Sequence, residues 1–207
     1  MNLLSIYKKT VTTCLFLLTL IGCSTLPESQ TSVEWQSHRQ KLTSISQYQA
    51  NGKLGYIAPD QRQSLNFNWR HSADENQLTL RTFLGQTVLT LDASSKGAQV
   101  TTMEGEVFRG HNAQQLIARL TGLSIPADSL SHWLIGLPDS ADYYELNQEN
   151  TLASLDKLIE GKNWRLTYSG YSDVMLDNES IPLPSRMTLT DGTTKLNIVI
   201  SKWVITR

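Results

Sequence analysis

The sequence predicts a mainly β fold, in which helices cover the apolar face of a curved antiparallel sheet. From Tyr48 onward, apolar and polar residues alternate along most of the chain, as they do in strands with one buried face. An Asp-Gly pair at 191–192 separates two such runs, which is a strong hairpin signal. Three short segments have helical spacing instead. A single sheet with one apolar face must cover that face, and these helices can do so.

The clearest alternation defines three neighbouring strands. By the two-residue period of a strand, one set of side chains points inward. This inward set is Leu65, Phe67, Trp69, Leu78, Leu80, Leu89 and Leu91. The same alternation recurs at 164–168, 187–189 and 196–200.

The helical segments are predicted at about 33–45, 113–120 and 130–134. Ser32 is a plausible N-cap for the first, and Asn112 with Gln115 forms a capping-box pattern before the second. Gly122 is placed to end the second helix, and Gly136 with Pro138 the third. The side chains that helical spacing turns inward are Leu116, Leu120, Trp133 and Leu134.

The N-terminus is typical of an exported bacterial lipoprotein. Lys8 and Lys9 precede a short apolar run that is too short to span a bilayer. The run ends at Leu20-Ile21-Gly22-Cys23, which has the form of a lipobox. We therefore predict a signal peptide at 1–22 and a lipid anchor on Cys23. The alternative is an ordinary secretory signal with a chance cysteine.

The predicted mature chain, residues 23–207, is of ordinary single-domain size. Cys14 leaves with the signal peptide and Cys23 is lipidated, so no disulfide is expected. Residues 24–32 are polar and aperiodic, which predicts a flexible tether before one domain at 33–207. Without Lys8 and Lys9, 16 basic residues face 19 acidic ones, a formal charge of −3. This balance gives nucleic-acid binding no electrostatic basis.

Motifs for catalysis or metal binding are weak. Gly170-Tyr171-Ser172 begins like a nucleophile elbow but lacks the second glycine. The four histidines are isolated from one another in sequence, and no glycine-rich phosphate loop follows a strand. We therefore expect no catalytic residues, no metal and no cofactor, although periodicity leaves open a site assembled from distant residues.

The same periodicity is compatible with two interiors. A gap between sheet and helices, lined by aliphatic and aromatic residues, would form a dry pocket suited to acyl chains. A filled core would give the same pattern, and base rates favour it.

Several stretches, in order along nearly the whole mature chain, resemble the LolB family of outer-membrane lipoprotein receptors. The most specific is His132-Trp133-Leu134-Ile135-Gly136-Leu137-Pro138. The others are Trp35-Gln36-Ser37-His38, Tyr48-Gln49-Ala50-Asn51-Gly52, Phe67-Asn68-Trp69, Leu84-Gly85, Leu120-Thr121-Gly122, 164–171, Leu183-Pro184, and Lys195-Leu196 running to Trp203.

The resemblance implies an incomplete antiparallel β-barrel with a helical lid over an apolar cavity, as in LolA and LolB. It implies a monomer, lipid-anchored in the outer membrane and facing the periplasm. Such a protein accepts acylated lipoproteins from the periplasmic carrier LolA and inserts them into that membrane. The eleven inward residues of the strands and helices above are then the candidate cavity lining, each of them also compatible with plain core.

The resemblance also implies that Phe83, Leu84 and Gly85 form a protruding membrane-insertion turn. Leu84 and Gly85 match the family pattern, whereas Phe83 stands where a proline is usual. The alternative is that Phe83 and Leu84 pack inward at a strand end.

Two other functions are compatible with the residues. A scaffold lipoprotein that braces an outer-membrane assembly complex would need a filled core and an exposed binding patch. An enzyme acting on periplasmic lipid would need clustered polar groups at a pocket mouth.

Overall fold

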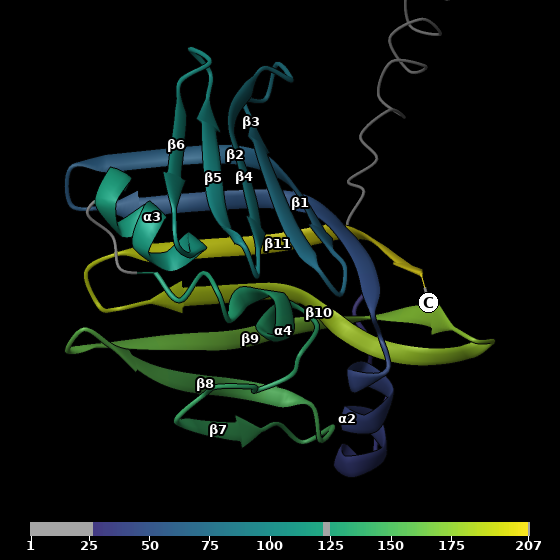
Figure 1. Ribbon diagram of the computed structural model, residues 1–207. Helices are drawn as coiled ribbons and strands as arrows, with labels where there is room; N and C mark the ends of the chain where they lie inside the picture. The colour runs from purple at the N-terminus through teal and green to yellow at the C-terminus, as the bar shows by residue number, and fades with distance from the viewer. Residues whose placement is uncertain (1–26, 122–124, 207) are drawn as a thin grey trace, which may run out of the picture.

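A computed structural model describes residues 27–121 and 125–206, in which eleven strands form one antiparallel sheet (Figure 1). The strands are β1 (Gln47–Ala58), β2 (Gln61–His71), β3 (Glu75–Arg81), β4 (Thr87–Ser94), β5 (Gly97–Thr102), β6 (Val107–Gly110), β7 (Tyr143–Leu146), β8 (Leu152–Ile159), β9 (Lys162–Leu176), β10 (Glu179–Thr190) and β11 (Lys195–Thr206). The helices are α2 (Trp35–Thr43), α3 (Ala113–Thr121) and α4 (Leu130–Leu134).

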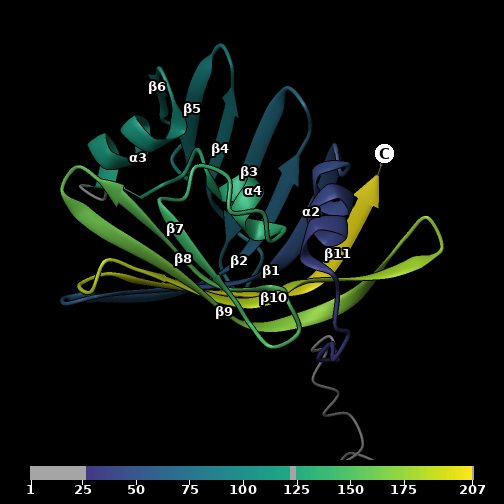
Figure 2. The ribbon, with the colours of Figure 1, turned by 90° about the horizontal axis from the view of Figure 1, so that it is seen from below.

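The strand order shows why the sheet stays open. Strands β1 to β6 lie side by side in chain order, and β6 forms one edge of the sheet. Strands β7 to β11 also lie side by side in chain order, and β7 forms the other edge. β11 pairs with β1, so the two halves meet in the middle of the sheet. Among the described residues no hydrogen-bonded ladder pairs the edge strands β6 and β7, and the chain between them carries α3 and α4. Figure 2 shows the resulting curved, unclosed sheet with the helices on its inner side. The predicted fold class is confirmed.

The helix ends follow local hydrogen bonding. The first helix is shorter than predicted, and its N-cap is Glu34 rather than Ser32: the Glu34 carboxylate accepts from the backbone N–H groups of Gln36 and Ser37, at 3.0 and 2.7 Å. The Asn112 cap on α3 is confirmed, since its Oδ1 accepts from Gln115 N at 2.8 Å. The predicted stop at Gly122 lies outside the described residues.

The buried apolar side chains of the described residues form a large and a small cluster, and Leu78 packs against both. The large cluster joins α2 and α4 to β8–β11, to the start of β1 and to the last part of β2. The small one lies beneath α3 and contains Leu91, Val100 and Leu116. The helical cover is therefore divided: α4 belongs to the main core, whereas α3 packs against β4, β5 and the edge strand β6.

Buried hydrogen bonds hold α4 in place. The hydroxyl of Tyr48 donates to the carbonyl of Ser131 at 2.5 Å, and that of Tyr168 donates to the carbonyl of Trp133 at 2.8 Å. The Trp133 indole, fully buried, donates to Asp139 O at 2.8 Å. Burial raises the pKa of both tyrosines well above the usual value, so the hydroxyls remain donors at neutral pH.

The described part of the segment predicted to be a tether is attached to the sheet. Ser29 N donates to Tyr171 O at 2.8 Å, and the Ser29 hydroxyl donates to the Asp173 carboxylate at 2.6 Å. Arg186 reaches Glu28 at 2.9 Å. In the structure Glu28 and Ser29 are thus bound to β9 and β10, partners that the composition of the expected tether does not reveal.

Burial of the His38 imidazole predicts that the stability of the fold decreases in mild acid. The residue is only 4% exposed, and burial, with a smaller contribution from Lys41, lowers its pKa to about 4. An unfolded chain binds the proton near pH 6.5 and the folded one does not, so stability falls as pH drops through this interval. We expect a loss on the order of 2 kcal/mol between pH 6.5 and 4.5 that is absent in His38→Leu. Urea unfolding at both pH values measures it; equal losses in the two proteins would contradict it.

Candidate functional site

The inner side of the sheet holds an apolar cavity of about 420 Å³. This volume lies within the range of ligand pockets, roughly 300–1,000 Å³. Strands β1–β4 and β11 form one wall, and residues of α3, α4 and the segment between them form the other. Among the described residues, those that line it are Leu54, Tyr56, Gln61, Gln63, Leu65, Phe67, Trp69, Leu78, Leu80, Leu89, Leu91, Ile117, Thr121, Ile125, Ala127, Leu130, Leu134, Leu196 and Ile198.

Eight of the eleven predicted cavity residues line this space: Leu65, Phe67, Trp69, Leu78, Leu80, Leu89, Leu91 and Leu134. The sheet register brings them together. Phe67 lies opposite Leu80, which lies opposite Leu89; Trp69 lies opposite Leu78, which lies opposite Leu91. Two rows of apolar side chains therefore cross β2, β3 and β4 on one face.

The other three predicted residues lie elsewhere. Leu116 is 1% exposed and belongs to the small cluster beneath α3, and Leu120 packs against that cluster. Trp133 is 0% exposed within the main core. Helical spacing identifies the inward face of a helix, but it does not separate residues that fill a core from residues that border a space.

The cavity wall formed by β1 and β11 is not among the residues predicted from the sequence. Leu54 pairs with both Leu65 and Ile198, and Tyr56 pairs with Leu196. The alternation of Leu196 and Ile198 was visible in the sequence. What was missing was the pairing of the first strand with the last, which brings these residues beside β2.

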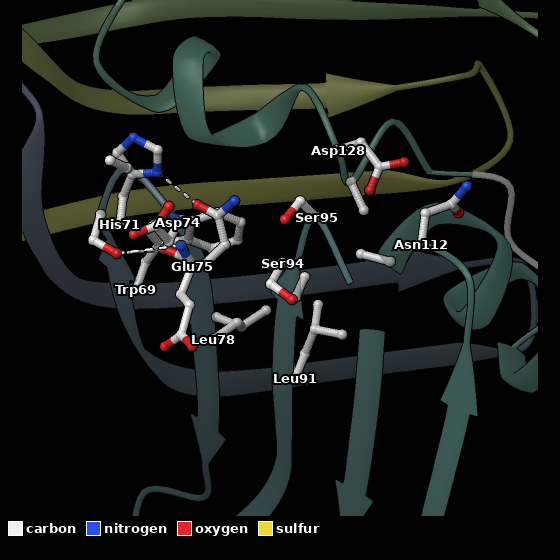
Figure 3. A pocket seen from close by; sticks show the side chains of 16 residues that line it. Trp69, His71, Asp74, Glu75, Leu78, Leu91, Ser94, Ser95, Asn112 and Asp128 are labelled. Atoms are coloured by element: carbon white, nitrogen blue, oxygen red, sulfur yellow. Dashed lines mark hydrogen bonds between the residues drawn. The ribbon is translucent and has the colours of Figure 1, made fainter. Parts of the chain in front are cut away.

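A polar pocket of about 290 Å³ adjoins the cavity and shares Trp69, Leu78, Leu91 and Ala127 with it. Figure 3 shows this pocket, with His71, Asp74 and Glu75 on one side and Asn112 and Asp128 on the other. Its described lining contains carboxylate, hydroxyl and amide groups but no Lys or Arg. The apolar cavity therefore borders a polar, mildly acidic opening.

Two histidines that are distant in sequence meet beside this pocket. The ring centroids of His71, at the end of β2, and His132, on α4, are 6.3 Å apart. His71 Nδ1 lies 2.7 Å from Asn76 Oδ1. Burial lowers the pKa of His71; the bond to Asn76 opposes that shift. The described residues contain no group of three or more His, Cys, Asp or Glu placed to hold a metal ion.

The turn between β3 and β4 projects from the sheet. Phe83 is 85% exposed and Leu84 72%, so neither packs inward. Thr82 N donates to Gln86 O at 2.9 Å and Gly85 N to Thr82 O at 3.0 Å. Gly85 has φ of 85°, a conformation that favours glycine. Two backbone hydrogen bonds therefore close this turn although it lacks a proline.

The elbow-like sequence at Ser172 does not form an elbow. Ser172 is 1% exposed and lies within β9, opposite Leu183 of β10. Its hydroxyl is enclosed and cannot meet a substrate. None of the helices in the described ranges is long and apolar enough to cross a bilayer.

Comparison with known proteins identifies the family. The sequence profile of "Outer membrane lipoprotein LolB" matches residues 46–203, which cover all of the cavity walls. The chain belongs to the LolB family. It is an outer-membrane lipoprotein of the lipoprotein-localisation pathway, and the resemblance predicted from its sequence is confirmed.

The relatives match over nearly their whole length. Outer-membrane lipoprotein LolB of Vibrio parahaemolyticus is 52% identical over 190 residues, which cover 92% of this chain and 94% of that protein. LolB of Vibrio vulnificus is 49% identical, covering 90% and 92%. LolB of Psychromonas ingrahamii is 33% identical, covering 95% and 97%.

A solved structure shares the fold. The crystal structure of an outer membrane lipoprotein-sorting protein domain from Vibrio parahaemolyticus superposes with a TM-score of 0.56 at 8% identity. The match covers 84% of this LolB-family chain and 92% of that domain. At this identity the likeness concerns the fold alone.

Proposed function

We propose that this LolB-family protein accepts acylated lipoproteins from the periplasmic carrier LolA and inserts them into the outer membrane. The observation that carries the proposal is the apolar cavity between sheet and helices, with Leu65, Leu80 and Leu89 only half-buried on its wall. A leucine packed in a filled core would lose nearly all of its exposure, as Leu155 does. Half-buried leucines that face an apolar cavity suit an apolar guest.

The energetics of acyl chains explain why such a site is needed. Three chains of about fifteen methylenes, at roughly 0.8 kcal/mol each, oppose escape into water by on the order of 35 kcal/mol. Transfer between dry cavities avoids that barrier and needs only a small downhill step. The proposed receptor therefore requires neither cofactor nor catalytic group, and it acts on cargo without chemical change.

The polar pocket gives the cargo an outlet. An acylated lipoprotein is apolar only at its chains, whereas its glyceryl group and polypeptide must remain hydrated or hydrogen-bonded. The pocket that contains Asp74, Ser94 and Asn112 borders the apolar cavity through shared residues. In the proposed complex the chains occupy the cavity and the polar part leaves through this opening.

The proposed anchor holds the body close to the membrane. We propose that residues 1–22 are removed as a signal peptide, that Cys23 carries the lipid, and that residues 33–207 form one monomeric domain facing the periplasm. Glu28 is already bonded to Arg186 of β10. Glu28 follows Cys23 by five positions, and five fully extended residue steps span at most about 17 Å. The body therefore stays within reach of the bilayer surface.

We propose that Phe83, Leu84 and Gly85 carry out the delivery step. We expect Leu84→Glu to lower delivery of cargo into vesicles at least tenfold, since transferring a charge into the apolar part of a bilayer costs roughly 2.5–3.5 kcal/mol. Acceptance of cargo from the carrier is expected to stay near wild type, because the 72% exposed side chain supports no core contact. Affinity capture measures acceptance and vesicle flotation measures delivery.

Met175→Glu is the matched control. Met175 is 63% exposed and lies near the end of β9, at the opposite end of the sheet from the β3–β4 turn. It should change neither step. Loss of both steps in Leu84→Glu, or of neither, would contradict a dedicated delivery role for the turn.

A further inference from the structure

The hairpin β5–β6 ends in a second turn of the same design as the β3–β4 turn. Residues 102–106 read Thr-Met-Glu-Gly-Glu, against Thr-Phe-Leu-Gly-Gln at 82–86. In the second turn Thr102 N donates to Glu106 O at 3.0 Å and Gly105 N to Thr102 O at 3.1 Å, the same two bonds that close the first. The φ of Gly105 is 82°, against 85° at Gly85. Met103 thus occupies the position of Phe83.

The two turns lie at the same end of the sheet. β3, β4, β5 and β6 are consecutive antiparallel neighbours, so the turn after β3 and the turn after β5 must face the same way. Figure 1 shows both hairpin tips projecting at the top of the view. Strands two positions apart are separated by roughly 10 Å, which sets the approximate spacing of the tips where they leave the sheet.

The second tip also exposes apolar surface. Met103 is 60% exposed and Val107, just behind it, is 44% exposed. A Cβ placed on Gly105 would meet no atom within 4 Å, so the tip stands free of other described residues. A narrow convex tip offers little area for a protein interface, which usually buries about 800 Å² per partner. It is well shaped to enter between lipid headgroups.

We propose that Met103 forms a second membrane contact, which works beside Phe83 and Leu84 on neutral, zwitterionic phospholipid. The inference rests on the proposed membrane role of the first turn. The partner is a lipid surface because the tip has the same backbone, direction and apolar lead residue as that turn. The two tips differ at the next position, where Leu84 is replaced by Glu104.

The glutamates determine how deep the second tip goes. Glu104 and Glu106 flank the free end of this turn, and both are exposed. Burying a carboxylate in hydrocarbon is costly, so these groups remain at headgroup level while Met103 reaches just beneath it. The first tip is therefore the deep contact and the second a shallow one, and together they orient the body on the surface.

The test uses the processed, lipidated protein in vesicles of phosphatidylcholine and phosphatidylethanolamine. Cys14 and Cys23 are the only cysteines in the sequence, and neither leaves a free thiol after processing. A single cysteine for an environment-sensitive fluorophore is introduced by Phe83→Cys, Met103→Cys or Met175→Cys. Wild type treated with the same reagent gives the background. Met175 matches Met103 in residue type and, at 63%, in exposure, but lies at the other end of the sheet.

We expect the fluorescence emission of the probes at 83 and 103 to shift to the blue, and a quencher embedded in the bilayer to quench both probes. The quencher that is most effective for the probe at 83 should lie deeper in the bilayer than the one that is most effective for the probe at 103. The probe at 175 should report water. Raising the fraction of anionic lipid should weaken the signal at 103, and Glu104→Gln with Glu106→Gln should restore it. Met103→Gln should lower cargo delivery roughly threefold to tenfold, the effect of partly burying one methionine.

The possible outcomes distinguish the second membrane contact from the proposed delivery role of the β3–β4 turn. A water-like probe at 103 with an embedded probe at 83 would overturn the second contact and leave the delivery turn standing. Water-like probes at both positions would overturn both. A shift at 103 that requires the carrier and not the vesicle would assign the second tip to a protein partner and would overturn the lipid assignment.

Discussion

Gly52→Ala is expected to destabilise the fold by about 3 kcal/mol or more. Gly52 lies on β1 at the register shift between β1 and β11. A Cβ at this position would be 2.0 Å from the carbonyl oxygen of Val199 and 2.8 Å from the Phe67 ring. The first clash involves backbone and cannot be relieved by a rotamer change. Because β1–β11 joins the two halves of the sheet, the strain falls on the pairing that forms the cavity wall.

Gly55→Ala is the matched control on the same strand. There the added Cβ would meet Asn197 at 3.6 Å, an ordinary van der Waals contact. Its effect should stay below about 1 kcal/mol. Chemical denaturation of both variants measures the difference. Equal stabilities for the two variants would show that the β1–β11 pairing accommodates the added methyl group at Gly52, and would contradict this prediction.

Leu80→Glu is expected to reduce cargo acceptance more than tenfold while the protein remains folded. Leu80 lies in the middle of the β2–β4 wall, between Phe67 and Leu89, and is only half-buried. In the empty cavity its carboxylate has space and access to water. With acyl chains bound the same carboxylate would be desolvated, a penalty of several kcal/mol. The charge therefore destabilises the protein with bound acyl chains more than the empty protein.

Val204→Glu separates this effect from a general effect of charge on the sheet. Val204 is 41% exposed on β11 and does not line the cavity. Capture of cargo from the carrier, with circular dichroism to confirm folding, should show loss only for Leu80→Glu. If Leu80→Glu accepted cargo as well as the wild type does, the acyl chains would bind elsewhere, and this cavity would not be their site.

The sheet was predictable because strand alternation is a local signal. Leu78, Leu80, Leu89 and Leu91 could be assigned to one face by parity alone, and the pairing of β3 with β4 places them as expected. The open edge between β6 and β7 was not predictable from alternation, because it depends on where hydrogen-bonded neighbours stop. It came from the family resemblance.

The helices show where periodicity stops being informative. Leu116 and Ile117 both lie on the inward side of α3, yet Leu116 fills the small cluster and Ile117 borders the cavity. Trp133 also has inward spacing, but it is fully buried in the main core, whereas the next residue, Leu134, lines the cavity. Distinguishing core from lining requires knowing how far apart the two layers sit. That distance is a property of the assembled fold.

Contacts between residues distant in sequence also could not be predicted from the sequence alone. The partners of Ser29 lie more than 140 positions away on β9, so composition alone indicated a tether there. His71 and His132 meet only because α4 folds back over the end of β2. The repeated turn at 102–106 is different, since its likeness to 82–86 was readable in the sequence but gained meaning only from exposure and direction.

The most direct test of the proposed function is to locate the acyl chains on the receptor after transfer. A lipoprotein carrying a photoreactive acyl chain would be handed over by its carrier and irradiated, and the crosslinked peptides would be identified by mass spectrometry. If the cavity accepts the acyl chains, we expect crosslinks on β2, β3 and β4 at cavity-facing residues such as Leu65, Leu80 and Leu89. Crosslinks confined to the outer face of the sheet, or to the cluster beneath α3, would contradict a lipid-accepting cavity.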